Sequence, residues 1–201
     1  MIHKKRREEL LSILGDDAVI IVSTNSEQKR NSDVNYPFRP DSSFWYLTGF
    51  IEPDAVAIFS KNNYSIFLRP KDQTKEIWNG VRLGIDLAPE TLLVDHAFDI
   101  DSFFDETSSQ INESSSVYFD APTDGGWKDN SSTNKLNAAI TVLLGKKLNP
   151  LNPYISEMRL IKDHSEIKNM KTAADLASKT HMKARVKTNT QRYQNNNEDE
   201  S

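Results

Sequence analysis

One short run constrains the fold of this 201-residue chain more than any other part of its sequence. Ala18–Ser23 reads Ala-Val-Ile-Ile-Val-Ser, an unbroken apolar stretch dominated by β-branched side chains. A strand with one face in water alternates apolar and polar residues, so a strand without alternation predicts burial on both faces. Such burial requires a sheet with helices packed on each side.

The remaining periodicity predicts an α/β fold, with a mixed sheet flanked by helices. Strands are expected at Ala55–Phe59 and Tyr64–Leu68, joined by a polar turn into a hairpin, and a short one at Val117–Phe119. The segment Thr24–Asp33 is expected to be a polar loop, and His96 to lie in another loop. Helical spacing occurs in four stretches, at residues 3–14, 99–111, 135–147 and 163–184.

Three segments of different character divide the chain. Residues 1–161 carry the alternating strands and helices and are expected to form one domain. Residues 162–184 carry a helix that starts with a capping-box pattern, with Asp163 as the cap and Glu166 three residues on. Residues 185–201 contain almost no large apolar side chains, which predicts a disordered polar tail.

Charge and composition exclude several classes of protein. A net charge of -4 and a pI near 5.6 argue against a general nucleic-acid binder. The basic run Lys4–Arg7 is interpreted as the solvated face of the first helix. The chain has no cysteine and no apolar run of about 18 residues, the length that a membrane span needs. A cytoplasmic protein without nucleic-acid or membrane partners is expected.

The usual catalytic spacings are missing from the sequence. It contains no nucleophile elbow, phosphate-binding loop, dinucleotide fingerprint or H-E-x-x-H motif. His164 and His181 would lie about 25 Å apart on one helix, too far to share a metal ion. The acidic residues at 95–105 lack calcium-loop spacing, and a helix start explains them. A site built on Asp95 and His96 is kept only as a minor hypothesis, and no catalytic or metal-binding residue is assigned.

The stretch Arg30–Asp54 combines charged and aromatic residues to an unusual degree. Its aromatic side chains should pack down, because a loop this aromatic would otherwise expose much apolar surface. Its Arg and Asp side chains can then satisfy each other and the local backbone. Two interpretations stay open, a structural loop motif or a recognition surface. The members of the structural loop motif are Arg30, Asp33, Tyr36, Arg39, Asp41 and Trp45.

Three blocks, in order along the chain, resemble the N-terminal domain of aminopeptidase P, a proline-specific aminopeptidase. They are Arg30–Asp54, Glu76–Gly84 (E-I-W-N-G-V-R-L-G) and Ser156–Lys162 (S-E-M-R-L-I-K). The resemblance covers residues 1–184 and implies the small α/β domain that precedes a pita-bread catalytic domain in this family. It further implies that residues 162–184 are the first helix of that catalytic domain, truncated here.

The resemblance implies an enzyme that removes the N-terminal residue before proline, using a dinuclear manganese site in the pita-bread domain. No position of this chain matches the family's metal ligands, so no metal is expected to bind it. The chain alone is expected to be inactive, with oligomerisation and shaping of the substrate pocket as its roles. Implied partners are a homo-oligomer or a full-length aminopeptidase subunit, and a peptide substrate only in the intact enzyme.

Two residues of the second block are candidates for the rim of the substrate pocket. Trp78 resembles a residue that faces this pocket across subunits, where an indole can stack on a prolyl ring. Trp78 is equally interpreted as an ordinary core or interface aromatic, and Arg82 as a nearby charge partner. The alternative for the whole chain is a free-standing, non-catalytic interaction module that binds a full-length aminopeptidase or another protein.

Overall fold

The computed structural model describes residues 2–113, 116–119 and 148–187, and the statements below concern these residues. The helix expected at 135–147 lies outside them. The chain divides into two compact units, Met1–Ser156 and Glu157–Ser201, and each is described by itself.

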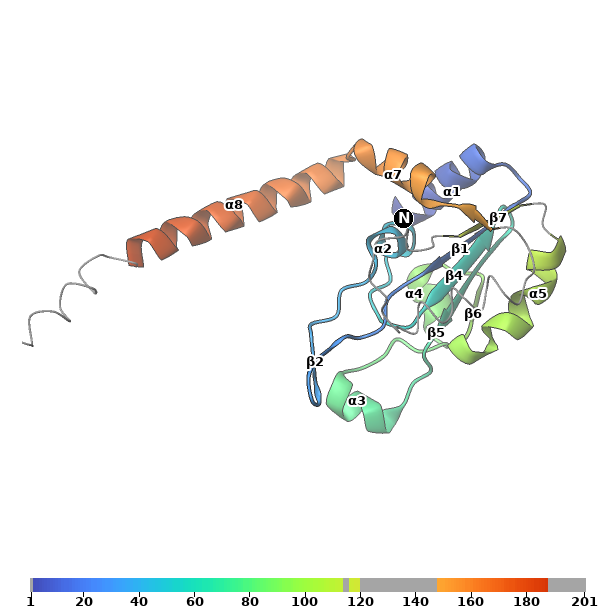
Figure 1. Ribbon diagram of the computed structural model, residues 1–201, viewed down its shortest axis with the longest axis horizontal. Helices are drawn as coiled ribbons and strands as arrows, with labels where there is room; N and C mark the ends of the chain where they lie inside the picture. The colour runs from blue at the N-terminus through green and yellow to red at the C-terminus, as the bar shows by residue number, and fades with distance from the viewer. Residues whose placement is uncertain (1, 114–115, 120–147, 188–201) are drawn as a thin grey trace, which may run out of the picture. The chain divides into compact units, whose positions relative to one another are not determined.

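A mixed sheet forms the centre of the first unit. In the described residues it has six strands in the order β6-β5-β4-β1-β7-β8 (Figure 1). β4 lies antiparallel between β1 and β5, whereas β7 runs parallel to β1 and β6 runs parallel to β5. The mixed sheet predicted from the sequence is confirmed. The strands are β1 (Ala18–Ser23), β4 (Val56–Ser60), β5 (Asn63–Leu68), β6 (His96–Asp99), β7 (Ser116–Phe119) and β8 (Leu148–Pro150).

β1 is buried along its whole length, as its unbroken apolar sequence predicts. Val19 and Ile21 face α5 (Phe103–Glu113), and the alternate side chains of β1 face the opposite layer. Full burial of a side chain such as that of Ile21 contributes about 1.5–3 kcal/mol to the free energy of unfolding. The cluster on the α5 side consists of Val19, Ile21, Val56, Ile58, Phe67, Phe103, Ile111, Val117 and Phe119.

The opposite face of the sheet is covered by α1 (Ile2–Leu14) and α2 (Ser42–Thr48), which pack on each other (Figure 1). The side chain of Tyr64 on β5 points to this face, and Arg7 of α1 lies over its ring. Helices on both faces explain why β1 has no polar side.

Two departures from the expected elements concern loops. Lys29–Asn31 (β2) and Val34–Asn35 (β3) form a small antiparallel hairpin within the expected polar loop, because the chain reverses at Ser32, where φ is +43°. His96 begins β6 and pairs with Ser65, so its placement in a loop was wrong. The remaining elements are α3 (Gln73–Asn79), α4 (Ala88–Leu92), the 3-10 turn η1 (Ile100–Ser102), α7 (Asn152–Leu160) and α8 (His164–Lys187).

The basic run at the N-terminus is only partly solvated, which corrects the sequence interpretation. Lys4 and Lys5 are exposed, but Arg6 and Arg7 are 5% and 6% exposed and lie on the buried face of α1. The helix therefore places two guanidinium groups in positions that an amphipathic pattern assigns to apolar residues. A hydrophobicity pattern cannot distinguish such arginines from solvated ones.

Both buried arginines bind the C-terminal end of α2. Arg6 Nη1 donates to the Tyr46 carbonyl oxygen at 3.3 Å, and Arg7 Nη1 donates to the Leu47 carbonyl oxygen at 2.7 Å. Their guanidinium carbons lie 3.9 Å and 3.7 Å from the ring centroids of Tyr46 and Tyr64. The last carbonyls of a helix lack intrahelical donors and carry partial negative charge, so cations satisfy them. We call these contacts the arginine lock.

α2 is fixed at its two ends by capping. The Asp41 carboxylate accepts the backbone N–H groups of Ser43 and Phe44 at 2.8 Å and 2.9 Å. At the other end Gly49 adopts φ +74°, a left-handed conformation that glycine tolerates best. A Cβ atom at position 49 would lie 2.7 Å from the ring of His3, so the close approach also requires glycine.

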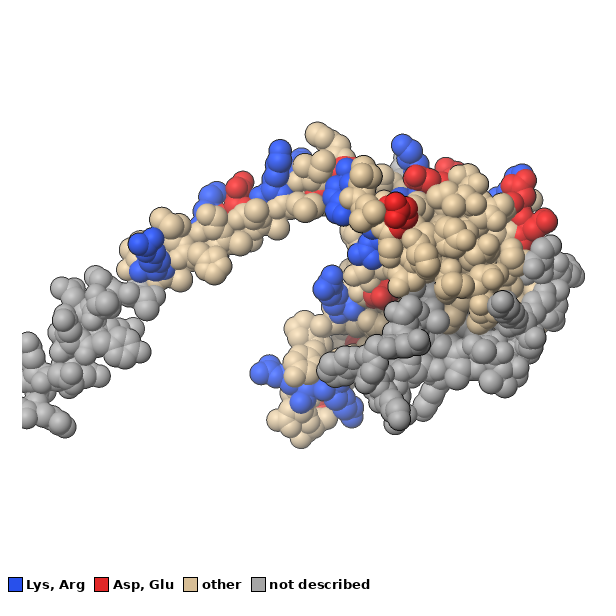
Figure 2. All heavy atoms as spheres, turned by 45° about the horizontal axis from the view of Figure 1, so that its top comes forward, with Lys and Arg blue, Asp and Glu red and all other residues tan. Residues whose placement is uncertain are grey.

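α8 starts with the capping box that the sequence predicts. The Asp163 N–H donates to Glu166 Oε2 and the Glu166 N–H donates to Asp163 Oδ1, each at 2.9 Å. The helix ends at Lys187, beyond the expected end at Ala184. Lys and Arg side chains are spread along it among acidic and uncharged ones (Figure 2). Its exposed large apolar side chains are Ile167, Met170, Leu176, Met182 and Val186.

The arginine lock predicts a large effect of substitution at Arg7. Arg7→Ala removes a charge-assisted hydrogen bond and a cation–π contact, and leaves the Leu47 carbonyl buried without its donor. We expect the free energy of unfolding to fall by about 2–4 kcal/mol in urea denaturation. The control Lys4→Ala, at an exposed position of the same helix, should change it by less than about 0.5 kcal/mol. Equal effects of the two variants would contradict the lock.

His3 makes the stability of the same contact depend on pH. Its Nδ1 lies 3.0 Å from the Tyr46 carbonyl oxygen, and burial lowers the pKa of His3, against the raising effect of that hydrogen bond. The unfolded chain then binds the proton more readily, so stability is highest above about pH 6.5 and is lost as the pH falls through the folded pKa. We expect the free energy of unfolding to decrease from about pH 7 to about pH 5. His3→Gln should weaken this dependence, and His181→Gln, at an exposed site, should not.

Candidate functional site

The second sequence block folds into α3 and the loop that follows it. The Asp72 carboxylate starts the helix by accepting the N–H groups of Thr74 and Lys75, both at 3.1 Å. The hydrogen bond from the backbone of Lys75 is the main cause that lowers the pKa of Asp72. Gly80 ends the helix with φ +87°. Residues next to the helix in sequence, Asp72 and Gly80, therefore define where α3 begins and ends.

α3 and the loop that follows it present an apolar surface to solvent. Ile77, Trp78 and Val81 are 77%, 84% and 84% exposed, and we call these three residues the Trp78 patch. Large apolar residues that are exposed together mark surfaces that contact another molecule or domain. The geometry thus places Trp78 at the surface and not in the core of this domain.

Arg82 has a different environment from Trp78. It is 8% exposed, its Nη1 donates to the Pro70 carbonyl oxygen at 2.9 Å, and its backbone N–H donates to Glu76 Oε1 at 3.2 Å. Arg82, buried inside the domain, therefore links the residues before and after α3 through these hydrogen bonds.

Glu52 completes this arrangement, and sequence reasoning gave it no role. Its Oε1 accepts the backbone N–H of Leu83 at 2.7 Å, while its buried Oε2 has no hydrogen-bond partner in the described structure. A buried carboxylate is costly unless it is hydrogen-bonded, so a carboxylate retained here has a positional role. The only sequence signal was its place in the Gly-Phe-Ile-Glu-Pro-Asp end of the first block.

Of the two roles expected for the charged residues of the loop motif, bonding to the local backbone occurs at Asp41, whereas no pairing of its Arg with its Asp side chains occurs within the described residues. In the described residues Arg30 lies 5.9 Å from the centroid of the Tyr36 ring, and Arg39 donates to Ser42 Oγ at 3.4 Å, not to an aspartate. Asp41 caps α2 and Asp33 is exposed at the hairpin turn. Asp41, the aspartate nearest in sequence to Arg39, thus already accepts hydrogen bonds from the backbone at the start of α2.

The aromatic residues of the same stretch are divided between core and surface. Phe44 and Tyr46 are buried as expected, whereas Tyr36 and Trp45 are 53% and 42% exposed. Trp45 contacts the His3 ring edge-to-face at 5.5 Å. The packing expected for this loop therefore holds for α2 but not for Tyr36.

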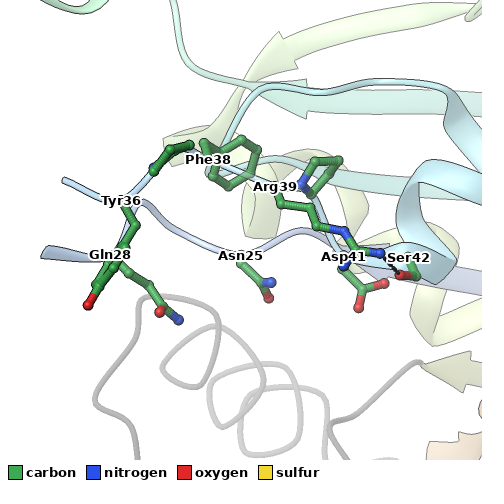
Figure 3. A pocket seen from close by; sticks show the side chains of 9 residues that line it. Asn25, Gln28, Tyr36, Phe38, Arg39, Asp41 and Ser42 are labelled. Carbon is green, nitrogen blue, oxygen red and sulfur yellow. Dashed lines mark hydrogen bonds between the residues drawn. The ribbon is translucent and has the colours of Figure 1, made fainter. Parts of the chain in front are cut away.

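Residues 36–42 line a hollow with a volume of about 310 Å³ together with two residues that follow β1 (Figure 3). We call it the 36–42 hollow. Sequence reasoning did not identify Asn25 and Gln28 as part of it, since only the fold brings them beside Tyr36. Its lining residues are Asn25, Gln28, Tyr36, Pro37, Phe38, Arg39, Pro40, Asp41 and Ser42.

The described residues do not form a metal centre. Within 2–113, 116–119 and 148–187, no group of three or more His, Cys, Asp or Glu side chains could hold a metal ion. The donor set therefore does not fit a dinuclear site, and no reaction step is assigned to a metal here. In that same part of the chain, no helix is long and apolar enough to cross a membrane.

The fold is that of a mixed α/β domain of the aminopeptidase P type. A family model described as "Aminopeptidase P, N-terminal domain" matches residues 3–118. The chain belongs to this family, which confirms the resemblance and the fold class inferred from the three sequence blocks.

Known relatives are longer than this chain. It is 34% identical over 195 residues to an Xaa-Pro aminopeptidase of Haemophilus influenzae, a match that covers 95% of this chain and 44% of that protein. Identity to the Xaa-Pro aminopeptidase of Escherichia coli is 33% over 194 residues, covering 92% and 44%. The structure of proline aminopeptidase P II from Yersinia pestis superposes with a TM-score of 0.79 at 31% identity, covering 91% of this chain and 44% of that one. The chain thus spans less than half of each.

Glu52 gives a test of how the α3 segment is held. Glu52→Ala leaves the half-buried Leu83 N–H without its acceptor, so we expect amide hydrogen exchange at Leu83 to accelerate about tenfold or more. Glu52→Gln keeps an acceptor oxygen and should retain most of the protection. Unchanged exchange in Glu52→Ala would show that Glu52 does not hold this segment.

Proposed function

We propose that this chain is the N-terminal part of an Xaa-Pro aminopeptidase and has a non-catalytic role in it. That enzyme would remove the N-terminal residue before proline. Membership of the family and the Xaa-Pro aminopeptidase names of the relatives support the proposal. The proposal includes a cytoplasmic location, because the chain contains no cysteine and therefore no disulfide.

The observation that carries the role is the Trp78 patch. A tryptophan 84% exposed beside two exposed aliphatic residues has no packing function in its own domain. We propose that the patch shapes the rim of the substrate pocket of a neighbouring subunit in an oligomer, with the indole stacking on the prolyl ring. Arg82, which is buried, would act there by holding the α3 segment and not by touching the peptide.

The chemistry would come from sequence that this chain does not span. The described residues do not fit a metal site, so we assign the manganese ligands to the rest of the intact enzyme's length. Residues 162–184 would be the first helix of its pita-bread domain, where a metal site would supply Lewis-acid chemistry for hydrolysis of the Xaa-Pro bond. Residues 185–201 would then be a polar appendage.

The exposed apolar side chains of α8 favour a second candidate, a free-standing module that docks on a full-length aminopeptidase. Size-exclusion chromatography of the chain with a full-length relative tests this candidate, which requires that a mixed complex forms. Release of the first residue from an Xaa-Pro peptide by the purified chain with manganese would contradict both.

A chimera tests the proposed role of Trp78. Residues 1–161 of this chain would replace the matching part of the Escherichia coli relative, and hydrolysis of an Xaa-Pro peptide would be measured. We expect Trp78→Ala to raise KM about 2–10-fold, the range for loss of one stacking contact, with a smaller effect on kcat. Trp78→Phe should recover part of the loss.

The matched control is Ile13→Ala, which removes an exposed apolar side chain from a different helix, α1. It should leave both kinetic constants unchanged. If Trp78→Ala also leaves them unchanged in an active chimera, Trp78 is not part of the substrate pocket.

A further inference from the structure

The C-terminal end of α3 carries the one Asn-Gly dipeptide of the sequence, Asn79-Gly80. An asparagine before glycine is prone to lose its side-chain amide, because glycine has no Cβ atom to obstruct the approach of its nitrogen to the asparagine Cγ. At Gly80 this approach is also clear of the rest of the domain, since an added Cβ would meet no described atom within 4 Å. The dipeptide therefore has the local geometry for an intramolecular reaction.

The Asn79 side chain is accessible for such a reaction. It is exposed, and no hydrogen bond holds its amide among the residues that the structure describes. Asn63, by contrast, begins β5, is half-buried and accepts a hydrogen bond from the Ser65 hydroxyl. Asn31 is exposed, but it is followed by Ser32, whose Cβ hinders the attacking nitrogen. Exposure and a following glycine thus coincide at position 79.

The helix itself restrains the reaction. The Gly80 N–H donates to the Glu76 carbonyl oxygen at 3.1 Å, so the Gly80 nitrogen can attack only after the last turn of α3 opens. Opening requires little free energy, because none of the seven residues of α3 is buried and the helix depends on its caps. The fraction of time for which this turn is open therefore sets the rate.

We propose that Asn79-Gly80 is a site of spontaneous deamidation, and that opening of α3 controls its rate. The Gly80 nitrogen bonds to Cγ of Asn79, the Cγ–Nδ2 bond breaks, and ammonia leaves with the proton of the Gly80 N–H. Water then opens the resulting cyclic imide at one of its two carbonyl carbons. One opening gives aspartate, and the other gives isoaspartate, in which the main chain runs through Cγ.

Both products weaken the end of α3. The new carboxylate lies at the C-terminal end of the helix, where the helix dipole disfavours negative charge. Isoaspartate also adds one atom to the main chain between Trp78 and Gly80, so the Gly80 N–H no longer matches its acceptor. The Trp78 patch then loses its fixed orientation relative to Arg82, which is held in the interior.

Mass spectrometry of the full chain, incubated in mildly alkaline buffer and sampled over weeks, tests the site. A tryptic peptide of residues 76–82 contains Asn79 as its only asparagine, and Asn31 serves as the internal control. We expect conversion at Asn79 to be at least about fivefold faster than at Asn31. Methylation by protein isoaspartate methyltransferase identifies the isoaspartate product. Asn79→Gln should abolish that methyl acceptance at position 79, because glutamine forms its larger ring far more slowly.

A pair of cap variants tests control by the helix. Asp72→Ala removes the carboxylate that accepts the Thr74 and Lys75 N–H groups, so α3 opens more often. We expect conversion at Asn79 to become about 3–10-fold faster in this variant. The matched control is Asp163→Ala, which removes the corresponding cap of α8 and should leave the rate at Asn79 unchanged.

Hydrogen exchange tests the effect of the products. In chain enriched in isoaspartate, amide exchange of residues 77–80 should be about threefold faster or more. Asn79→Asp adds the charge without the extra main-chain atom and should show a smaller increase.

Three results would overturn the proposal. Conversion at Asn79 no faster than at Asn31 would remove the site. Equal rates in Asp72→Ala and in the unsubstituted chain would show that α3 does not control the reaction. Unchanged exchange in the isoaspartate form would show that the products leave α3 intact. None of these measurements involves peptide hydrolysis, so the inference goes beyond the proposed aminopeptidase role and does not depend on it.

Discussion

The arginine lock is the contact on which the arrangement of this domain depends. α2 is a short helix whose C-terminal carbonyls point into the interface with α1, where water cannot satisfy them. Arg6 and Arg7 supply donors and charge at that point, and the tyrosine rings beneath them compensate for the desolvation. Because α2 rests on β1, the lock also orients the loop that leads into α2, and with it the 36–42 hollow.

Much of the fold follows from local sequence, and the exceptions have two physical causes. The burial of Ala18–Ser23, the hairpin of β4 and β5 and the capping box of α8 were predicted, because residues close in sequence determine them. The buried side of the basic run was missed, because a guanidinium is buried only when distant carbonyls and rings surround it. β2 and β3 were missed as well, since two very short strands leave almost no periodic signal.

The residues of the candidate site also fall into those that the sequence identifies and those that only the fold reveals. Trp78 could be selected from its block, but the sequence left open whether it was core or surface, and only the fold exposes it. Arg82 belongs to the same block and yet lies inside, because Pro70 and Glu76 surround it. Glu52 lies 31 positions from its partner Leu83, so no spacing rule could connect them. Contact residues are thus visible in a sequence motif, whereas the residues that position them are not.

The close packing of His3 against Gly49 has a consequence for how relatives of this chain vary. The imidazole occupies the volume that any side chain at position 49 would need, and the backbone there is left-handed. A larger residue at 49 is therefore compatible with the fold only when residue 3 becomes smaller and the turn changes conformation. Residues 3 and 49 should vary together across an alignment, as a pair that records the contact between α1 and the end of α2.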